Sequence, residues 1–408
     1  LTRSAPNWLL NLEKCKDSEK LMKKIWLLGL LCLPFLLVNK SIASSDLQPP
    51  NILRLGINMH PLQPVHGAPD KVLQQVGLVR SVGTSLIRID IHWAWIAYLS
   101  ADPTTWNQSQ IDWLNAFLND IAGSNIEVLA VVTETPCWAS ADPNKVCTTM
   151  ARNYDWRYPP SNPQDYANFI SELVRRYKGK IKYWEIWNEP NLPYSWASPN
   201  PAAYTELLKA AYPAIKAVDS GAIVVGGSLA PWNGNSDYAV NAVNYLDGMY
   251  TSGAKGYFDR LSFHPYTDGN SPTWYDARWP MSSYSYSVPA IRQKMQEYND
   301  SSLIWLTEVG YTTVPSCEPS LCWTPTLPKT ESEQAAYMVD MLNIARTWNY
   351  VETLVWYELM DMTDPPDKNV NPEYYFGLFR KDFSPKVAAS QFRDMVFPIK
   401  VFLPMTIR

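Results

Sequence analysis

Residues 183–190, YWEIWNEP, carry an apolar strand directly into an Asn-Glu-Pro turn. The proline ends the strand because it has no N–H to donate to the hydrogen-bond ladder of a sheet. Residues 303–311, LIWLTEVGY, have the same order, with a glutamate near the end of an apolar run. Such nearly continuous apolar runs are typical of strands buried on both faces, as in a parallel sheet. The two segments therefore predict an α/β fold with a glutamate at the ends of two strands.

Outward from these segments, apolar runs alternate with stretches whose apolar residues recur about every 3.6 positions, as in amphipathic helices. We expect strands at residues 53–59, 85–91, 126–132, 181–187, 222–228, 258–263, 303–307 and 351–357. We expect helices at residues 70–82, 108–122, 163–177, 201–218, 288–298 and 331–347. Typical helix starts support three of them: Asn162-Pro163, Asn200-Pro201, and a capping box of Thr330 and Glu333.

Eight strands in alternation with helices predict an α/β fold of the (β/α)8 TIM-barrel type, in a single domain. An open doubly wound sheet is the alternative, and it would usually show a glycine-rich turn after its first strand. Residues 58–61, which end the first expected strand, read NMHP and contain no glycine. The expected divisions are an upstream segment with a signal peptide at 1–43, a linker at 44–50, the catalytic domain at 51–398 and a C-terminal tail at 399–408.

The N-terminal region has the pattern of an export signal. Lys23 and Lys24 precede an apolar run at 25–38, and residues 41–43, SIA, offer small side chains for cleavage. The run is shorter than the roughly 20 residues of a membrane span, although an uncleaved anchor is the alternative. We expect a secreted or periplasmic protein, with a signal peptide around residues 22–43 and no stable membrane insertion after its cleavage.

The charge balance argues against a nucleic-acid partner. Residues 1–43 hold seven of the 35 basic and three of the 39 acidic side chains, so the remainder of the chain has a net charge of −8. Binding to phosphate backbones depends on an excess of Lys and Arg. The 18 Trp and 24 Tyr residues suit a large core, and they equally suit a surface that covers the apolar faces of sugars.

Four cysteines follow the expected signal peptide, in two local pairs: Cys137 with Cys147, and Cys317 with Cys322. In an oxidising compartment such pairs are typical of disulfides that close loops. A four-thiolate zinc site is the alternative, but neither pair has the usual C-x₂-C spacing. We therefore predict two disulfides, 137–147 and 317–322.

Glu189 and Glu308 are the candidate catalytic residues. They lie 119 positions apart, at the ends of the fourth and seventh expected strands, so both belong to the mouth of the barrel. Glycoside cleavage needs two carboxyl groups, one to protonate the leaving oxygen and one to attack the sugar carbon or activate water. Their separation distinguishes retaining from inverting enzymes, and the sequence alone leaves it open. Glu185, in the middle of its strand, is expected to be structural.

The chain resembles glycoside hydrolase clan A, most closely family 39 and its exopolysaccharide-degrading relatives, with a family 5-like chain as a further possibility. The resemblance is carried by residues 187–190 (WNEP), 307–308 (TE), 88–90 (RID), 259–266 (DRLSFHPY) and 356–359 (WYEL). It covers the expected barrel from residue 55 to about residue 380. It implies a retaining β-glycosidase that acts by double displacement.

The resemblance also implies roles for single residues. Glu189 would be the general acid/base and Glu308 the nucleophile, while Asn188 would bind the sugar 2-hydroxyl. Different pKa values for the two carboxyl groups would let one hold its proton while the other stays ionised.

Four further residues would line the floor of the site by the same resemblance. Tyr266 would hold Glu308, and Arg88 would favour the ionised form of a neighbouring carboxyl group. His264 would lie beside them, and Trp356 would form a platform under the sugar. The alternatives are structural: Arg88 as an ion-pair partner of Asp90 or Glu185, and His264 as a satisfied buried side chain.

Two residues after the third expected strand are candidates from position alone. Glu134 would bind a sugar hydroxyl or be a solvated loop residue, and Trp138 would contact sugar or pack. The four His residues show no metal-ligand spacing such as H-E-x-x-H, so we predict no metal site and no cofactor.

The predicted partner is a polysaccharide or oligosaccharide, bound by a monomer. Endo action on an extracellular or cell-wall polysaccharide is the first expectation, because the long connections at the barrel mouth are rich in Trp, Tyr and Pro. The alternatives are an exo-acting β-xylosidase-like enzyme and a catalytically inactive carbohydrate-binding barrel.

Overall fold

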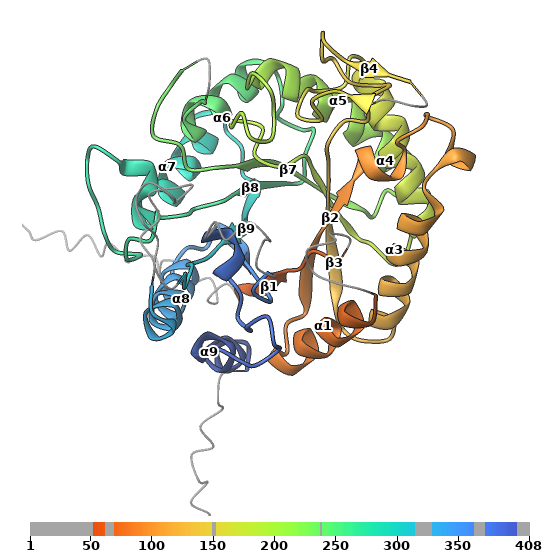
Figure 1. Ribbon diagram of the computed structural model, residues 1–408. Coiled ribbons are helices and arrows are strands. Elements are labelled where there is room, and N and C mark those ends of the chain that lie inside the picture. Colours follow the sequence, from red (N-terminus) through yellow and green to blue (C-terminus); the bar gives the residue numbers. More distant parts are fainter. Residues whose placement is uncertain are drawn as a thin grey trace, which may run out of the picture. The chain divides into compact units, whose positions relative to one another are not determined.

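The computed structural model describes residues 52–61, 69–148, 152–236, 239–314, 329–362 and 372–397. Within them, eight parallel strands form a closed barrel surrounded by helices (Figure 1). The barrel strands are β1 (Arg54–Asn58), β2 (Leu86–His92), β3 (Glu127–Thr133), β6 (Tyr183–Ile186), β7 (Ile223–Leu229), β8 (Arg260–Phe263), β9 (Leu303–Val309) and β10 (Val351–Trp356). Each pairs with the next along the chain, and β10 pairs with β1 to close the barrel. The predicted single-domain (β/α)8 barrel is confirmed.

The helices of the described residues follow the strands in order. They are α1 (Pro69–Val82), α3 (Gln108–Ile121), α4 (Pro163–Tyr177), α5 (Pro201–Val218), α6 (Ala242–Thr251), α7 (Tyr284–Glu297), α8 (Glu331–Arg346) and α9 (Val387–Val396). The loops add the one-turn helix α2 (Trp93–Ile96), the 3₁₀ turns η2 (Pro103–Thr105), η3 (Pro280–Ser282) and η4 (Pro372–Tyr375), and the strands β4 (Val146–Cys147) and β5 (Arg152–Asn153). Helices α6 and α9, of ten residues each, were not among the expected helices.

Side chains at three helix starts explain where those helices begin. The Asn162 side chain accepts a hydrogen bond from the Gln164 amide at the start of α4, and Asn200 caps α5 in the same way. Thr330 and Glu333 form a reciprocal capping box at α8. Such caps satisfy backbone N–H groups that have no partner within the helix. All three predicted helix starts are confirmed.

Alternation along the strands divides the apolar side chains into two layers. One set points into the lower part of the barrel and forms its internal core: Leu86, Leu129, Tyr183, Val225, Trp305 and Val355. The other set points outward and forms a much larger core between the strands and the helices. Because the barrel interior is filled with side chains, a ligand has access only at the ends of the strands.

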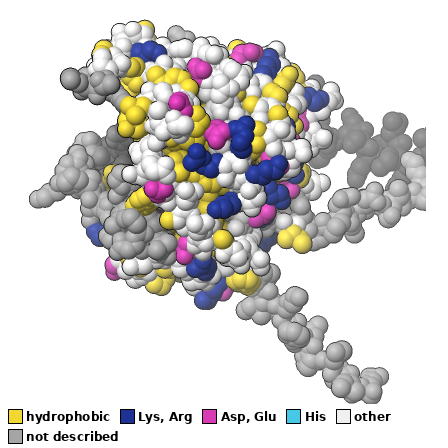
Figure 2. Space-filling model, turned by 90° about the vertical axis from the view of Figure 1, so that its right-hand side faces the viewer, with side chains coloured by type: hydrophobic (Ala, Val, Ile, Leu, Met, Phe, Trp, Pro, Cys, Tyr) yellow, Lys and Arg dark blue, Asp and Glu magenta, His cyan; other side chains and the backbone are white. Residues whose placement is uncertain are grey.

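The outer faces of the helices are solvated. On the face shown in Figure 2, Lys and Arg side chains are interspersed with Asp and Glu side chains. Amphipathic helices that cover a barrel are expected to present such a polar face. No helix among the described residues combines the length and the apolar character that crossing a membrane would require.

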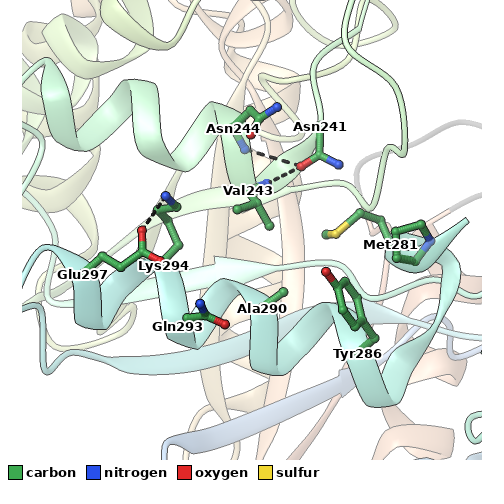
Figure 3. A pocket seen from close by; sticks show the side chains of 10 residues that line it. Asn241, Val243, Asn244, Met281, Tyr286, Ala290, Gln293, Lys294 and Glu297 are labelled. Carbon is green, nitrogen blue, oxygen red and sulfur yellow. Dashed lines mark hydrogen bonds and ion pairs between the residues drawn. The ribbon is translucent and has the colours of Figure 1, made fainter. Parts of the chain in front are cut away.

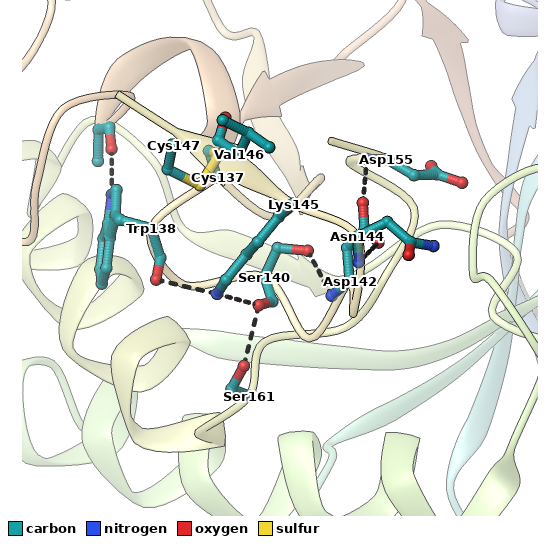
Figure 4. The surroundings of a disulfide bond; sticks show 11 residues. Cys137, Trp138, Ser140, Asp142, Asn144, Lys145, Val146, Cys147, Asp155 and Ser161 are labelled. Atoms are coloured by element: carbon teal, nitrogen blue, oxygen red, sulfur yellow. Dashed lines mark hydrogen bonds between the residues drawn. A yellow bond between two sulfur atoms is a disulfide. The ribbon is translucent and has the colours of Figure 1, made fainter. Parts of the chain in front are cut away.

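A disulfide joins Cys137 to Cys147 in the long loop after β3, with 5.7 Å between the Cα atoms (Figure 4). Around it, the loop is held by its own polar groups: the Lys145 ammonium bonds the Ser140 carbonyl, and the Asp142 carboxylate accepts from the Asn144 amide at 2.8 Å. This predicted disulfide is confirmed. Cys317 and Cys322 lie outside the described residues, so the second disulfide stays a prediction.

Candidate active site

Glu189 and Glu308 meet at the carboxyl ends of the barrel strands. Glu308 is the penultimate residue of β9, and Glu189 follows the end of β6 by three residues. A carboxylate oxygen of each, together with a ring nitrogen of His264, lie within 4.8 Å of one another. The Glu189 and Glu308 side chains retain 19% and 12% exposure, so both are accessible from the mouth of the barrel. The structure therefore brings the two predicted carboxyl groups into one site.

Arg88, on β2, organises the floor of this site. Its guanidinium group is buried and donates to Glu185 and to Glu308, each at 2.6 Å. It also donates to the Asn188 side-chain oxygen at 2.9 Å. One side chain from β2 thus fixes groups on or next to β6 and β9. Arg88 therefore pairs with Glu185, as the structural alternative expected, and with the catalytic candidate Glu308 at the same time.

The Glu308 carboxyl group has a lowered pKa. Burial alone would raise this pKa, but the positive charges of His264 and Arg88 outweigh burial and lower it below the ordinary value of 4.5. The Tyr266 hydroxyl donates to the second carboxylate oxygen at 3.1 Å. Burial and the neighbouring Glu308 raise the pKa of Tyr266 well above 10, so its hydroxyl stays protonated as a donor. Glu308 is therefore held as a carboxylate near neutral pH.

His264 connects the two glutamates. Its Nδ1 lies 2.9 Å from a Glu189 oxygen and 3.8 Å from a Glu308 oxygen. Its Nε2 is within hydrogen-bond distance of the Ser228 and Thr307 hydroxyls, at 3.1 and 3.0 Å. Burial lowers the pKa of His264, but the two nearby carboxylates raise it to a value above the ordinary 6.5. The ring is therefore fixed on both sides and faces both carboxyl groups.

The turn after β6 places Asn188 and Glu189 through an unusual backbone path. Trp187 and Glu189 both adopt positive φ, 66° and 44°, which is the left-handed region that non-glycine residues seldom occupy. The Glu189 amide donates to the Ser228 carbonyl at 3.0 Å, which holds the turn against the end of β7. Because Arg88 uses the Asn188 oxygen, the amide NH₂ group of Asn188 is the part available to a ligand.

The predicted role of Trp356 needs correction. Trp356 is fully buried and belongs to the outer core between the strands and the helices. Its neighbour Val355 points into the barrel interior, so the alternation of the strand directs Trp356 away from the site. The next residue, Tyr357, has the opposite parity and lies near the site, with its ring centroid 6.3 Å from that of Tyr266. A platform residue at this strand end would be Tyr357.

Glu134 and Trp138 lie at the same end of the barrel. Glu134 is almost fully buried and lies 2.9 Å from the His92 ring, so it is not a solvated loop residue. Trp138 is partly exposed, donates its indole N–H to the Ala97 carbonyl at 2.7 Å and packs edge-on against Trp93. The structure thus gives Trp138 a packing role on one side and leaves part of its ring open.

Sequence reasoning missed a second polar cluster at the barrel mouth. His60, just after β1, bonds the Asp90 carboxylate through Nδ1, and its Nε2 lies 3.4 Å from Glu358. Burial would lower the pKa of His60, but Asp90, Glu358 and Glu308 together raise it to about 9. The signal that was available is a histidine at a strand end, in residues 58–61. Its partners are 30 and nearly 300 positions away, which no local pattern reveals.

One group among the described residues has the residue types of a metal site: Glu189, His264 and Glu308. The Arg88 guanidinium group already contacts one Glu308 oxygen at 2.6 Å. A divalent ion at this position would be repelled by that buried positive charge. The arrangement of two carboxyl groups, a cation and a phenol is instead suited to acid/base and nucleophilic chemistry on a bound sugar.

The family profile described as cellulase (glycosyl hydrolase family 5) matches residues 56–356, and no curated protein matches significantly. Among solved structures, a family 39 glycoside hydrolase from Bacteroides cellulosilyticus WH2 is 23% identical, with a TM-score of 0.60 over 84% of this chain and 63% of that one. A monomeric β-xylosidase from Caulobacter crescentus CB15 is 20% identical, with a TM-score of 0.58 over 84% and 67% of the two chains.

A further solved structure widens this range of relatives. The exo-β-1,4-mannosidase Op5Man5 from Opitutaceae bacterium strain TAV5 is 15% identical, with a TM-score of 0.56 over 85% of this chain and 59% of that one. The chain therefore spans about three fifths to two thirds of the length of these three proteins. At these identities the likeness shows the shared barrel fold.

Proposed function

Given that this chain belongs to the cellulase family, glycosyl hydrolase family 5, and is a glycoside hydrolase of clan A, we propose that it cleaves β-linked sugars with retention of configuration. In this proposal Glu308 is the nucleophile and Glu189 the general acid/base. The single observation that carries it is the distance between their carboxylates, whose nearest oxygens lie within 4.8 Å. Retaining enzymes have their carboxyl groups roughly 5–5.5 Å apart, and inverting enzymes roughly 6.5–9.5 Å.

The reaction would proceed in two displacements. The Glu308 carboxylate attacks the anomeric carbon while Glu189 gives its proton to the departing glycosidic oxygen, so that a glycosyl ester forms and the sugar–oxygen bond breaks. Glu189, now ionised, takes a proton from a water molecule that attacks the same carbon and releases Glu308. The Asn188 amide would bind the 2-hydroxyl, a contact that strengthens in the transition state.

The surroundings of the two glutamates support this division of roles. Arg88 and Tyr266 both contact Glu308, at 2.6 and 3.1 Å, and both favour its ionised form. Glu189 has His264 at 2.9 Å and no Arg or Lys partner among the described residues. The group that must attack contacts the Arg88 guanidinium, whereas the group that must carry a proton shares His264 with it and has no such contact.

We further propose a polysaccharide substrate, endo action and secretion. Exposed aromatic side chains on the loops after β7 and β8, such as Trp232 and Trp279, support contact with an extended sugar chain. The disulfide between Cys137 and Cys147 supports an oxidising compartment, together with the expected signal at residues 22–43. The alternative is exo action, since the structural relatives include a β-xylosidase and an exo-β-1,4-mannosidase.

The test is sugar release from a panel of polysaccharides and aryl β-glycosides by wild type, Glu308→Gln and Glu189→Gln. We expect Glu308→Gln to lose about 10⁴-fold or more on every substrate, which is about 5 kcal/mol of barrier. Glu189→Gln should lose about 10²–10⁴-fold where the leaving group needs a proton, and much less on activated aryl glycosides. The matched control is Glu352→Gln, at the opposite end of the barrel, which should leave the rates unchanged.

The configuration of the first anomer released, measured by NMR, tests whether cleavage retains the configuration of the anomeric carbon. A β-configured product supports double displacement, whereas an α-configured product would show an inverting enzyme and overturn the role of Glu308 as nucleophile. Equal rates for both Gln variants and wild type would place the active site elsewhere.

A further inference from the structure

A pocket of about 320 Å³ lies between helices α6 and α7, and η3 lines it as well (Figure 3). This volume is at the lower end of the roughly 300–1,000 Å³ that small-molecule sites occupy. The pocket is lined by residues outside the catalytic site, chiefly Asn241, Asn244, Met281, Tyr286, Gln293 and Lys294. Its size therefore suits one sugar unit or a group of similar dimensions.

The lining combines a flat apolar surface with neutral hydrogen-bonding groups. Tyr286 is 42% exposed, and the further apolar residues of the lining include Ala290 and the buried Met281. The side chains of Asn244 on α6 and Gln293 on α7 also line the pocket (Figure 3). Pyranose rings have apolar C–H faces and a rim of hydroxyls, so a ring with amides beside it matches their chemistry.

The charges in the pocket are compensated internally. Lys294 contacts Glu297 at 2.6 Å and Asp247 at 3.1 Å. The cation is therefore already balanced by two carboxylates, and an anionic ligand would gain little from it. Among ligands of this size, a neutral sugar fits better than a phosphate or a uronic acid.

The pocket is linked structurally to the side of the catalytic site where Glu189 lies. The Ser228 carbonyl, at the end of β7, accepts from the Glu189 amide, and the loop that follows carries the exposed Trp232. In the same loop, the Asn233 side chain accepts from the Met281 amide at 2.7 Å and donates to the Ser282 hydroxyl at 2.8 Å. One continuous loop thus extends from the acid/base to a wall of the pocket.

The chemistry of the reaction indicates which part of the substrate lies on the Glu189 side of the catalytic site. A general acid protonates the departing oxygen, so the leaving part of a substrate extends past the acid, away from the nucleophile. Two more exposed aromatics, Tyr275 and Trp279, lie on the loop after β8 that leads into the pocket, and the Tyr275 ring centroid is 5.6 Å from that of Tyr286. A sugar chain that leaves by this side would meet an aromatic surface before it reaches the pocket.

We propose that the α6–α7 pocket is a second carbohydrate-binding site, which holds a neutral pyranose unit of the leaving portion of the polysaccharide through Tyr286, Asn244 and Gln293. The inference rests on the proposed function, since it takes the polymer to be the substrate. The pocket contributes no group to bond cleavage. It increases the time that a long chain spends on the enzyme, so its effect is confined to polymeric substrates.

The kinetic test compares Tyr286→Ala and Gln293→Ala with wild type on a cleaved polysaccharide and on an aryl β-glycoside. Loss of an aromatic contact in a binding site usually weakens binding by about tenfold. We expect KM for the polysaccharide to rise about 5–10-fold with kcat unchanged, and kcat/KM for the aryl glycoside to stay within about twofold. Tyr286→Phe, which keeps the ring, should retain most of the polymer affinity.

Phe397→Ala, which removes an exposed aromatic side chain just after α9, is the matched control and should behave as wild type. An unchanged polymer KM in Tyr286→Ala and Gln293→Ala would overturn the proposal, and so would equal losses on both substrates, which indicate a structural defect. Affinity gel electrophoresis of the same variants in xylan, mannan and β-glucan separates this inference from the proposed function. Retardation of wild type that Tyr286→Ala reduces supports the second site even if no polymer is cleaved.

Discussion

The two ends of the barrel both carry arginine–glutamate networks, but in different environments. At the amino ends of the strands, Arg260 contacts Glu352 at 2.5 Å, and their side chains are 27% and 32% exposed. At the carboxyl ends, Arg88 contacts Glu185 and Glu308 at 2.6 Å, and these side chains are 1%, 0% and 12% exposed. The same residue types thus form a half-solvated network at one end and a nearly dry one at the other.

This difference in exposure indicates that the two networks have different roles, one structural and one functional. A partly exposed ion pair contributes little to stability, usually about 0–1 kcal/mol, because water and salt screen it. A buried ion network carries a desolvation penalty that its attraction often fails to repay. The network around Arg88 is therefore poorly explained as a stabilising device, and well explained as the environment that keeps Glu308 ionised in an apolar barrel.

The largest expected effect on stability comes from Arg88→Met, which leaves two buried carboxylates without their cation. We expect the free energy of unfolding to fall by about 3–5 kcal/mol, because breaking a buried pair leaves uncompensated charge. The pKa of Glu308 should rise as well, which would move the acid limb of the kcat/KM profile to higher pH. Urea unfolding and a pH–rate profile check the two effects, and an unchanged acid limb would show that Arg88 does not control the ionisation of Glu308.

The next effect depends on pH and involves His60, which faces Asp90 on β2, Glu358 after β10 and Glu308 on β9. Its pKa of about 9 in the folded protein is above the ordinary 6.5, so its stabilising contribution is complete below pH 6.5 and is lost as the pH rises through 9. A shift of this size corresponds to about 3 kcal/mol. The measurement is the free energy of unfolding at pH 6 and pH 9.5.

The His60→Gln variant isolates this contribution from other groups that titrate in the same window. Its stability should decrease less between the two pH values than that of wild type, by about 3 kcal/mol. If wild type and variant lose the same amount, His60 does not carry its proton at neutral pH and the cluster is held by neutral hydrogen bonds.

The smallest effect on stability should come from the half-solvated network of Arg260 and Glu352. Arg260→Met removes the cation beside Glu352, and we expect a loss of under about 1 kcal/mol and no change in kcat. Urea unfolding of this variant beside Arg88→Met measures the contrast between the two ends directly. Similar losses for both variants would show that burial does not distinguish the two networks.

Much of the fold was predictable because buried strands and helix starts have recognisable patterns within a few residues of the sequence. The apolar runs at residues 303–307 and 126–132 have the composition of strands, and Asn162 and Thr330 mark helix starts by chemistry within three residues. The catalytic candidates were predictable for the same reason, since each glutamate lies at or just after the end of a strand-like segment. The platform role of Trp356 came from the resemblance, and the adjacent apolar residues 354–357 do not show which parity faces the barrel interior.

By itself, the sequence determined the alternation of strands and helices, and with it the barrel and the position of Glu189 and Glu308 at its mouth. These features follow from patterns within a few residues, which local physical chemistry dictates. The tertiary structure alone decided which side chains contact one another at the mouth of the barrel. Arg88 contacts Glu308 across 220 positions, and His60 joins Asp90 to Glu358, because closure of the barrel brings β1, β2, β9 and β10 together. The charge environment of the nucleophile therefore exists only once the barrel has closed.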